Sequence, residues 1–461
     1  MTRWALAAIF VLVLASRLAH LRIVWVEEAY PAAAAIEVLD SGKVLYRDVW
    51  FDKPAGTAYL YCLWGARTGI ALRLADTAFL FSCCLLLFQL GRQLWSDREG
   101  VIAAALLAVY LTFGIPAAVM AIAPDLALVL PHIAAMYFAF LKRPVWAGVC
   151  AGIGFWFNTK ALFVLASCVL FLSPLEWIWL GCGFAAATAV QFGVLISQGA
   201  FGAYVDQVWR WGAMYARHPF VEDPVLYGLK QTLNWCGFQS AAVLGTILYF
   251  FKGDRRWRFA GWIALSLIPV VLGLRFFPRY YFQLLPVIAL LAARGFTMQK
   301  SRPVMQWLLL ALVLIPVARF GPRYVMLTTD LIAGRQPVWS DLALAQDSEH
   351  VASALKGRSG SLFVWGYRPD IYVLTRMPAA TPFLDSQPLS GVIADRHLKS
   401  EDVSAPEWAE RFRGTVERAR PDYIVDGLGP LNPKLKIPES YIASYAVIAT
   451  TGGSVVYQRN P

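Results

Sequence analysis

Residues 26–54 read VEEAYPAAAAIEVLDSGKVLYRDVWFDKP and combine two adjacent acids, an alanine-rich run, a glycine and a charged loop. The stretch follows a first apolar segment, residues 4–18, and much of the chain after it is equally apolar. Charged groups beside membrane-spanning segments usually mark sites or transport pathways, because they are costly to hold there. We therefore interpret 26–54 as part of a functional site rather than as a connector.

The composition predicts a membrane protein with many spans. Of 461 residues, 58% are hydrophobic and 15% are charged, whereas soluble domains carry about 25% charged residues. The net charge of +11 does not indicate nucleic-acid binding, since no basic stripe with interleaved aromatics occurs and many basic residues lie in short loops. The seven cysteines include no CxxC pair, so the sequence offers no zinc or thiol-redox motif.

Eleven apolar runs have lengths that suit membrane crossing, if tilt and kinks are allowed for. The first of them resembles a signal peptide but lacks a small-residue cleavage site, so we expect an uncleaved first span. The runs are residues 4–20, 72–94, 100–116, 124–141, 145–158, 161–175, 177–197, 237–251, 259–274, 281–294 and 303–319.

The basic residues of the connecting loops predict the orientation. They fall on alternate loops, which the positive-inside rule assigns to the cytoplasm; they are Arg92, Arg98, Lys142, Arg143, Lys252, Arg255, Arg256, Arg258, Arg294, Lys300 and Arg302. The loops at 21–71, 198–236 and 275–281 and the tail after 320 then face outward. This orientation places a set of ionisable residues at one membrane face: Glu27, Glu28, Asp48, Asp52, Lys53, Asp125, Lys160, Asp206, Arg275 and Arg279.

Local signals predict the elements outside the spans. Pro31 and Gly42 suit the start and the stop of a helix over 31–41, with Glu27 and Glu28 just before its N-terminus. A second amphipathic segment is expected at 56–66. The tail reads as strands at 361–365, 423–425 and 454–458 alternating with helices at 341–356 and 406–419, and its most distinctive stretch is 366–383.

The expected fold class is thus a polytopic α-helical membrane protein with a small C-terminal α/β domain. Residues 1–319 form the expected transmembrane catalytic domain, which includes the amphipathic helices of the loop 21–71, and residues 320–461 the extracytoplasmic domain.

The same-sided charges fit one kind of chemistry well. Arginine and lysine are the usual partners of a lipid phosphate. Carboxylates suit general-base activation of a hydroxyl or coordination of a divalent cation such as Mg²⁺ or Mn²⁺. Sugar transfer from a polyprenyl-phosphate-linked donor uses all of these groups, but the residues alone also fit a transporter of anions.

The run 27–56 resembles the first outer loop of GT-C fold glycosyltransferases, of the branch that contains the family 39 enzymes, protein O-mannosyltransferases and the lipid A aminoarabinose transferase. That family shows an Asp-Glu pair, a Tyr, a small-residue helix, a Gly and a Lys-Pro. The matching residues here are Glu27-Glu28, Tyr30, Gly42 and Lys53-Pro54, followed by Arg73-Leu74, Pro124-Asp125, Thr159-Lys160, FPRYYFQLLP at 277–286 and VWGYRPDIYVLTRMPAATPF at 364–383.

The resemblance implies an inverting transferase at the outer face of the cytoplasmic (inner) membrane. It implies that Glu27 is the catalytic base, although relatives usually carry Asp there, with Glu28 supporting it or contacting a metal. It further implies Asp125 as a second carboxylate of the active site, and Lys53, Lys160, Arg275 and Arg279 as ligands of the donor phosphate. Relatives often have His near position 279, where this chain has an arginine that cannot serve as a base.

Each assignment has a structural alternative. Glu28 also suits helix capping, Lys53 and Lys160 suit anchoring at the headgroups, and Arg275 and Arg279 suit pairing with acids of neighbouring loops. Tyr30, Asp48 and Asp52 are expected to order the loop or to contact the substrate, with metal contact by the two aspartates as an alternative, and Asp76 is expected to pair with Arg73.

Two other functions stay open at this level. A transporter or flippase for an anionic lipid, or a subunit that binds such a lipid without catalysis, would also use the cations. The sugar and the acceptor, whether glycan, lipid or protein, have no local sequence code.

Overall fold

The computed structural model describes residues 2–218, 221–299, 303–336 and 339–461. Lys300 and Arg302 therefore lie outside the described residues. The chain forms two compact units. The helical unit comprises Met1–Arg22, Gly69–Val194 and Val221–Gln336, and the mixed unit comprises Ile23–Thr68, Leu195–Phe220 and Pro337–Pro461. The boundary expected after residue 319 falls inside a helix that continues to Ile332.

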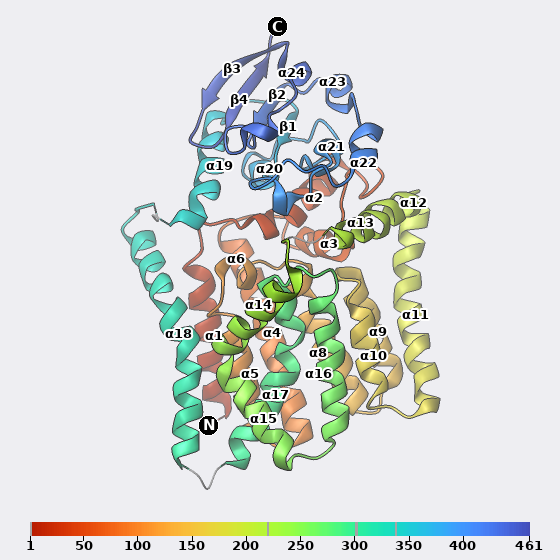
Figure 1. The fold of residues 1–461 in the computed structure, drawn as a ribbon, viewed down its shortest axis with the longest axis vertical. Coiled ribbons are helices and arrows are strands. Elements are labelled where there is room, and N and C mark those ends of the chain that lie inside the picture. Colours follow the sequence, from red (N-terminus) through yellow and green to blue (C-terminus); the bar gives the residue numbers. More distant parts are fainter. Residues whose placement is uncertain (1, 219–220, 300–302, 337–338) are drawn as a thin grey trace. The chain divides into compact units, whose positions relative to one another are not determined.

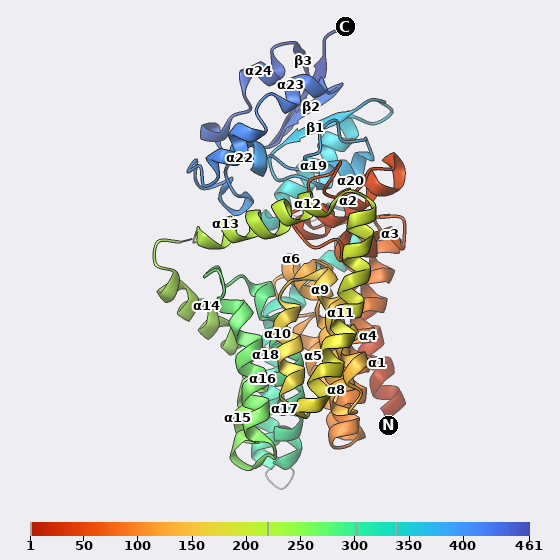
Figure 2. The ribbon, with the colours of Figure 1, turned by 90° about the vertical axis from the view of Figure 1, so that its right-hand side faces the viewer.

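The long helices of the helical unit run alongside one another (Figures 1 and 2). A helix occurs at every position where the sequence predicts a span. The elements are α1 Thr2–Leu18, α4 Ile70–Leu94, α5 Asp97–Tyr110, α6 Pro116–Val119, α7 Pro124–Ala127, α8 Val129–Phe140, α9 Pro144–Phe157, α10 Ala161–Val169, α11 Pro174–Ser197, α14 Pro224–Phe238, α15 Ser240–Lys252, α16 Arg256–Val271, η2 Pro278–Gln283, α17 Leu285–Met298 and α18 Pro303–Ile332. The sequence did not predict α14, which falls within a stretch expected to be mainly loop.

Three of the described helices are long and apolar enough to cross a membrane, namely α4, α11 and α18. Several shorter helices are also apolar, including α9, α15 and α17. Length and composition thus indicate a membrane protein, while the number of eleven spans stays a prediction.

Glycines allow the helices of this unit to pack closely. A Cβ added at Gly295 of α17 would lie 1.9 Å from the carbonyl oxygen of Gly245 in α15, and one at Gly148 of α9 would lie 2.0 Å from the carbonyl oxygen of Leu180 in α11. Membrane helices pack through small residues of this kind, because association there depends on close van der Waals contact.

The mixed unit is built on a four-stranded sheet in the order β1-β2-β4-β3. β1 Leu362–Trp365 and β2 Tyr423–Asp426 are parallel and fully buried, and β4 Val455–Arg459 pairs antiparallel with both β2 and β3 Tyr445–Thr450. The three predicted strands are present. The sequence did not predict β3, whose residues YAVIAT are apolar but half-buried to exposed in the structure.

Short helices surround this sheet and the loop that precedes α4. They are α2 Val26–Ser41, α3 Gly56–Cys62, α12 Phe201–Tyr204, the π-helix η1 Val205–Arg210, α13 Trp211–Arg217, η3 Ser340–Leu342, α19 Ala343–Ala354, α20 Asp370–Thr375, α21 Gln387–Ser390, η4 Ala394–Arg396, α22 Pro406–Arg411, α23 Thr415–Ala419, η5 Pro433–Leu435 and α24 Glu439–Ile442. The helix predicted over 406–419 is divided at Gly414, whose φ of 72° is left-handed.

α2 differs from its prediction at one end. It stops as expected at Gly42, whose left-handed backbone directs its N–H to the carbonyl of Glu37. It begins at Val26, however, five residues before the predicted start, so Pro31 lies inside the helix. The acids Glu27 and Glu28 therefore belong to its first turn, where unpaired amides and the helix dipole favour negative charge.

The tail segment 366–383 is joined to α2 by charged contacts. The Glu37 carboxylate accepts the amide of Ala379 (2.8 Å) and pairs with Lys43 (2.6 Å). Arg376 pairs with Asp40 at the end of the helix (2.8 Å). The tail and the loop, which are far apart in sequence, thus form one packed body.

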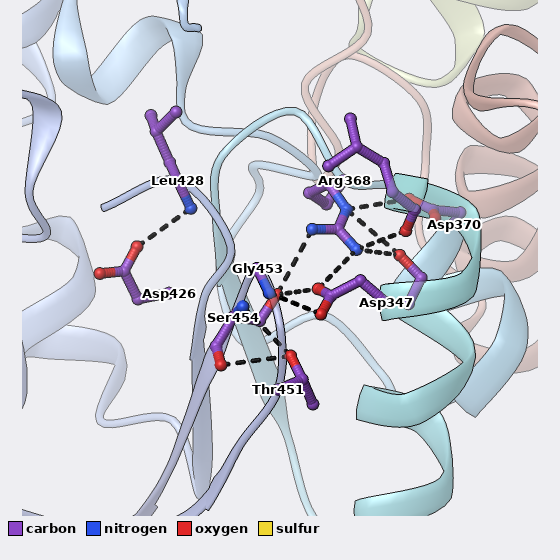
Figure 3. Close-up of polar contacts among 10 residues, drawn as sticks. Asp347, Arg368, Asp370, Asp426, Leu428, Thr451, Gly453 and Ser454 are labelled. Atoms are coloured by element: carbon purple, nitrogen blue, oxygen red, sulfur yellow. Dashed lines mark hydrogen bonds and ion pairs between the residues drawn. The ribbon is translucent and has the colours of Figure 1, made fainter. Parts of the chain in front are cut away.

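Arg368 of the same segment is the centre of a buried cluster (Figure 3). Its side chain is 4% exposed and pairs with Asp347 of α19 (3.2 Å) and with Asp370 (3.9 Å). It also donates to the hydroxyl of Ser454 (3.3 Å), which in turn donates to Asp347 (2.6 Å). The conspicuous GYRPD sequence therefore connects α19 to the β3–β4 turn rather than presenting its arginine to a ligand.

Candidate active site

Asp125 organises a charged cluster in the helical unit. Its carboxylate lies at the first turn of α7, and its side chain is 8% exposed. Oδ1 accepts from the ammonium of Lys160 (2.7 Å) and from the amide of Asn158 (3.1 Å). Asn158 ends α9 and Lys160 precedes α10, so the break between these two helices brings both donors to one acid.

A second layer of hydrogen bonds holds Asp125 in place. Gln283 donates to the carbonyl of Asp125 (3.0 Å), and its own carbonyl meets the ring of His132 (3.1 Å). The Trp262 indole donates to the other nitrogen of His132 (2.9 Å). Because these partners lie on three different elements, the position of the carboxylate is fixed by the packing of the helical unit.

Arg279 completes the cluster from the turn that precedes α17. Its guanidinium lies 3.8 Å from Oδ2 of Asp125 and its side chain is 29% exposed. The Lys160 ammonium lies 3.5 Å from the ring centroid of Tyr280, a cation–π contact, and is 15% exposed. Two partly exposed cations thus share one buried carboxylate. Arg275, in contrast, is almost completely buried.

The two acids of α2 have different surroundings. Glu28 is fully buried and its Oε1 accepts the backbone N–H of Trp25 (2.8 Å), so its carboxylate caps the helix. Glu27 is partly exposed in the same turn. The structure therefore gives the capping contact to position 28 and leaves residue 27 the more exposed of the two acids.

Tyr30, Asp52 and Lys53 come together in the mixed unit. The Tyr30 hydroxyl accepts the amide of Asp52 (3.3 Å), and its ring stacks on Phe51 with a centroid distance of 5.1 Å. The Asp52 carboxylate pairs with the Lys53 ammonium (2.7 Å), which is 40% exposed. Burial raises the pKa of Tyr30 well above its usual value, and the charges of Asp52 and Asp385 raise it further.

Asp385 is a buried acid that the sequence reasoning missed. It is fully buried after β1 in the tail, and its Oδ1 accepts the amide of Gln387 (2.8 Å). Burial, with the negative charge of Asp52 as the next cause, raises its pKa to about 7. Within the described residues, Oδ2 of Asp385 and Oδ1 of Asp52 have no hydrogen-bond partner. No local motif surrounds Asp385, so only the fold reveals it.

Two further expectations concern the role of Asp48 in its loop and the binding of a metal ion. Asp48 accepts the amide of Val44 (2.9 Å) and pairs with Arg47 (2.8 Å), so it orders its own loop. Among the described residues, no group of three or more His, Cys, Asp or Glu side chains gathers in a way that could hold a metal ion. The divalent cation expected at Glu27 and Glu28 stays a prediction.

Comparison with known proteins identifies the fold. No protein-family model matches the sequence, and no curated protein matches it. Two solved structures of ArnT from Cupriavidus metallidurans are similar over nearly the whole chain. The form bound to undecaprenyl phosphate has a TM-score of 0.64 at 13% identity and covers 99% of this chain and 98% of that one. The apo form has a TM-score of 0.60 at 14% identity and covers 98% and 96%.

The resemblance to the GT-C fold inferred from the sequence is thus confirmed. At this low identity the likeness extends to the fold, and the roles of individual residues rest on their own geometry.

Proposed function

We propose that this protein transfers a sugar from a polyprenyl-phosphate-linked donor to an acceptor hydroxyl, with inversion at the anomeric carbon. The main support for this proposal is the fold. Over nearly its full length it matches a solved structure that is bound to undecaprenyl phosphate. The cations that the structure gathers on Asp125 support the proposal, because a lipid phosphate needs such partners.

Lys160 and Arg279 are the proposed ligands of the donor phosphate. Both are partly exposed and both are held by Asp125, so they are positioned before any ligand arrives. When the glycosidic bond breaks, negative charge accumulates on the phosphate, and fixed cations stabilise that charge without reorganisation. Lys53 is a third proposed ligand, held by Asp52. Arg275 is the weakest candidate of the four, because it is almost completely buried.

Glu27 is the proposed general base. Its neighbour Glu28 is fully buried and accepts the amide of Trp25, whereas Glu27 is partly exposed in the same turn. It takes the proton from the acceptor hydroxyl while the hydroxyl oxygen attacks the anomeric carbon. The bond from that carbon to the phosphate oxygen breaks, and polyprenyl phosphate leaves with the electron pair.

The location follows from the loop charges. We propose that the reaction takes place at the outer face of the cytoplasmic membrane, with residues 1–319 as the transmembrane catalytic domain and 320–461 as an extracytoplasmic domain. The contacts of segment 366–383 with α2 support a role for the tail in holding the catalytic loop.

The proposal is tested with lipid-linked sugars supplied to the purified protein in nanodiscs, with release of polyprenyl phosphate as the readout. We expect release from one class of donor, and loss of release in Glu27→Gln at unchanged protein abundance. Glu28→Gln is the matched control, since an amide oxygen still accepts the Trp25 N–H and activity should remain. Near-normal turnover of Glu27→Gln contradicts the assignment of the base, and donor binding without transfer by the wild-type protein points instead to a lipid-binding subunit or a flippase.

A further inference from the structure

A cavity of about 270 Å³ lies inside the mixed unit and takes no part in the proposed chemistry. It is bounded by the loop that contains Tyr46 and Trp50, by the π-helix η1, and by tail residues from Pro382 to Thr415. All of these segments belong to one compact unit. The cavity therefore has a defined lining, and the chemistry of its side chains can be compared with that of possible ligands.

Aromatic rings form its walls. The ring centroid of Trp50 lies 5.3 Å from that of Trp408 and 5.9 Å from that of Phe383, and Phe383 lies 4.8 Å from Phe412. The faces of such rings carry negative charge density, which attracts the partly positive C–H groups on the face of a sugar ring. The indole N–H of Trp50, a lining residue, is buried and has no partner in the described part of the chain, and a buried donor of this kind needs a partner.

Arginines add positive charge to the aromatic lining. The Arg411 guanidinium lies 5.4 Å from the ring centroids of both Trp408 and Phe412, is 55% exposed, and is held by Asp206 at 3.3 Å. Arg47 is 51% exposed and is held by Asp48 and by the carbonyl of Gln198. Both guanidinium groups are oriented while retaining N–H donors that can bind a carboxylate or a phosphate.

The local charge balance is positive. Arg210 pairs with Asp206 at 2.6 Å, so three arginines, at 47, 210 and 411, face two aspartates, at 48 and 206. One cation is left in excess, and an anionic ligand would balance it.

The backbone around the cavity is unusual at two places. Tyr46 has a left-handed φ of 69°, a conformation that is costly for a residue with a side chain and that persists only where the surroundings enforce it. Asp206 and Gln207 lie on a π-helix, a form that occurs frequently at functional sites. Gln207 connects the two places, because its side-chain oxygen accepts from Phe51 N (2.9 Å) and its side-chain nitrogen donates to the Tyr46 carbonyl (2.8 Å).

We propose that this cavity binds one sugar ring that carries a carboxylate or a phosphate, as part of the acceptor. The proposal rests on the proposed transfer reaction and adds the class of its acceptor. Aromatic walls, with a buried indole N–H that has no partner among the described residues, suit the ring, and Arg47 with Arg411 suits the anionic group. The volume falls just below the range of about 300–1,000 Å³ that holds drug-sized ligands, which fits a single ring.

The test measures binding of free sugars to the full-length protein in nanodiscs by saturation-transfer NMR. The probes are glucuronic acid, glucose 6-phosphate and glucose, and the comparison of the first two distinguishes a carboxylate from a phosphate as the anion. We expect at least one of the two anionic sugars to bind about ten-fold or more tightly than glucose, as a charge-assisted hydrogen bond to arginine implies. Equal binding of all three sugars, or tighter binding of an acidic peptide, overturns the proposal.

Two arginines of one segment provide a matched pair of variants. Arg411→Gln should weaken binding of the anionic sugar about ten-fold and leave glucose unchanged. Arg413→Gln should change neither, because Arg413 is 78% exposed, pairs with Glu410 and does not line the cavity. If Arg411→Gln also loses glucose binding, the substitution has damaged the pocket. A second variant, Trp408→Phe, keeps an aromatic wall, and it must still bind glucose for the proposal to hold.

The outcomes separate this proposal from the proposed function. If the protein releases polyprenyl phosphate from a lipid-linked donor but binds no anionic sugar, the sugar site is wrong and the transfer reaction stands. If an anionic sugar binds as expected but no donor is turned over, the site stands as a sugar-binding site and its role for an acceptor is wrong.

Discussion

Two groups of buried carboxylates in this chain differ in how many partners their oxygens have. In the helical unit, Asp125 has cations beside both oxygens, Lys160 at 2.7 Å and Arg279 at 3.8 Å. In the mixed unit, Asp52 has a single cation and Asp385 accepts one amide, and each leaves one oxygen without a partner among the described residues. The first arrangement holds two cations in position, whereas burial raises the pKa of Asp385 to about 7 in the second.

The difference separates two uses of an acid in one fold. A carboxylate with several partners holds other groups in position, and its removal affects them before it affects the proton balance. A buried carboxylate with few partners can have a raised pKa, and its contribution to the stability of the fold then changes with pH. Variants of Arg368, Asp385, Lys160 and Asp48 test this distinction.

The largest effect on stability is expected in a third acid cluster, the one around Arg368. Arg368→Met leaves the buried Asp347 and Asp370 without their cation, and breaking a buried pair in this way costs about 3–5 kcal/mol. We expect a large drop in the unfolding temperature of the purified protein. Arg358→Met is the control, because Arg358 is exposed and its bond to Gln458 is a surface contact. Equal stability of the two variants would show that the buried cluster does not hold the mixed unit together.

Asp385→Asn should change stability in the opposite direction. The pKa of Asp385 is raised to about 7 from an ordinary value of 3.8, so the folded protein binds more protons than the unfolded chain between these values. The contribution of Asp385 to stability should therefore be greatest below about pH 4, fall as the pH rises toward 7, and stay low above it. A shift of this size corresponds to up to about 4 kcal/mol.

The asparagine variant removes this dependence, because a neutral amide has no charge to bury. We expect Asp385→Asn to be more stable than the wild type at pH 8 and nearly equal to it at pH 4, as measured by unfolding temperature across that range. Asp422→Asn is the control, since Asp422 is more exposed and its pKa is lowered by its contacts with Ser361. A wild-type protein whose stability rises between pH 5 and pH 8 while the variant stays flat would contradict the assignment.

The fixed charges of the helical unit are expected to affect the reaction. Lys160→Met removes the cation nearest to Asp125, and loss of one stabilising group of this kind costs about 100-fold in turnover. The measurement is kcat/KM for release of polyprenyl phosphate. Lys142→Met is the matched control, because Lys142 lies between α8 and α9 and bonds to the carbonyl of Phe171. Equal activity of the two variants would assign Lys160 to structure alone.

The sequence predicted much of this picture, and the misses have physical causes. Helices and core strands follow from apolar runs, and the association of Asp125, Lys160 and Arg279 was anticipated by their expected location at one membrane face. Asp385 was missed because its neighbours come from distant segments and no spacing in the sequence brings them together. The start of α2 was misplaced because Pro31 resembles a first-turn proline, whereas Trp25 and Glu28 form the real N-terminus.

The smallest effect is expected at Asp48, which resembles Asp125 in having several partners but differs in exposure. Its carboxylate is 34% exposed, and Arg47 holds its pKa below the usual value. Solvent screens such pairs, so they contribute about 0–1 kcal/mol. Asp48→Asn should therefore lower the unfolding temperature only slightly, and because the amide oxygen can still accept the Val44 N–H, turnover should stay within about two-fold of the wild type. A loss as large as that of Lys160→Met would mean that partner number, rather than burial, decides which carboxylates matter in this fold.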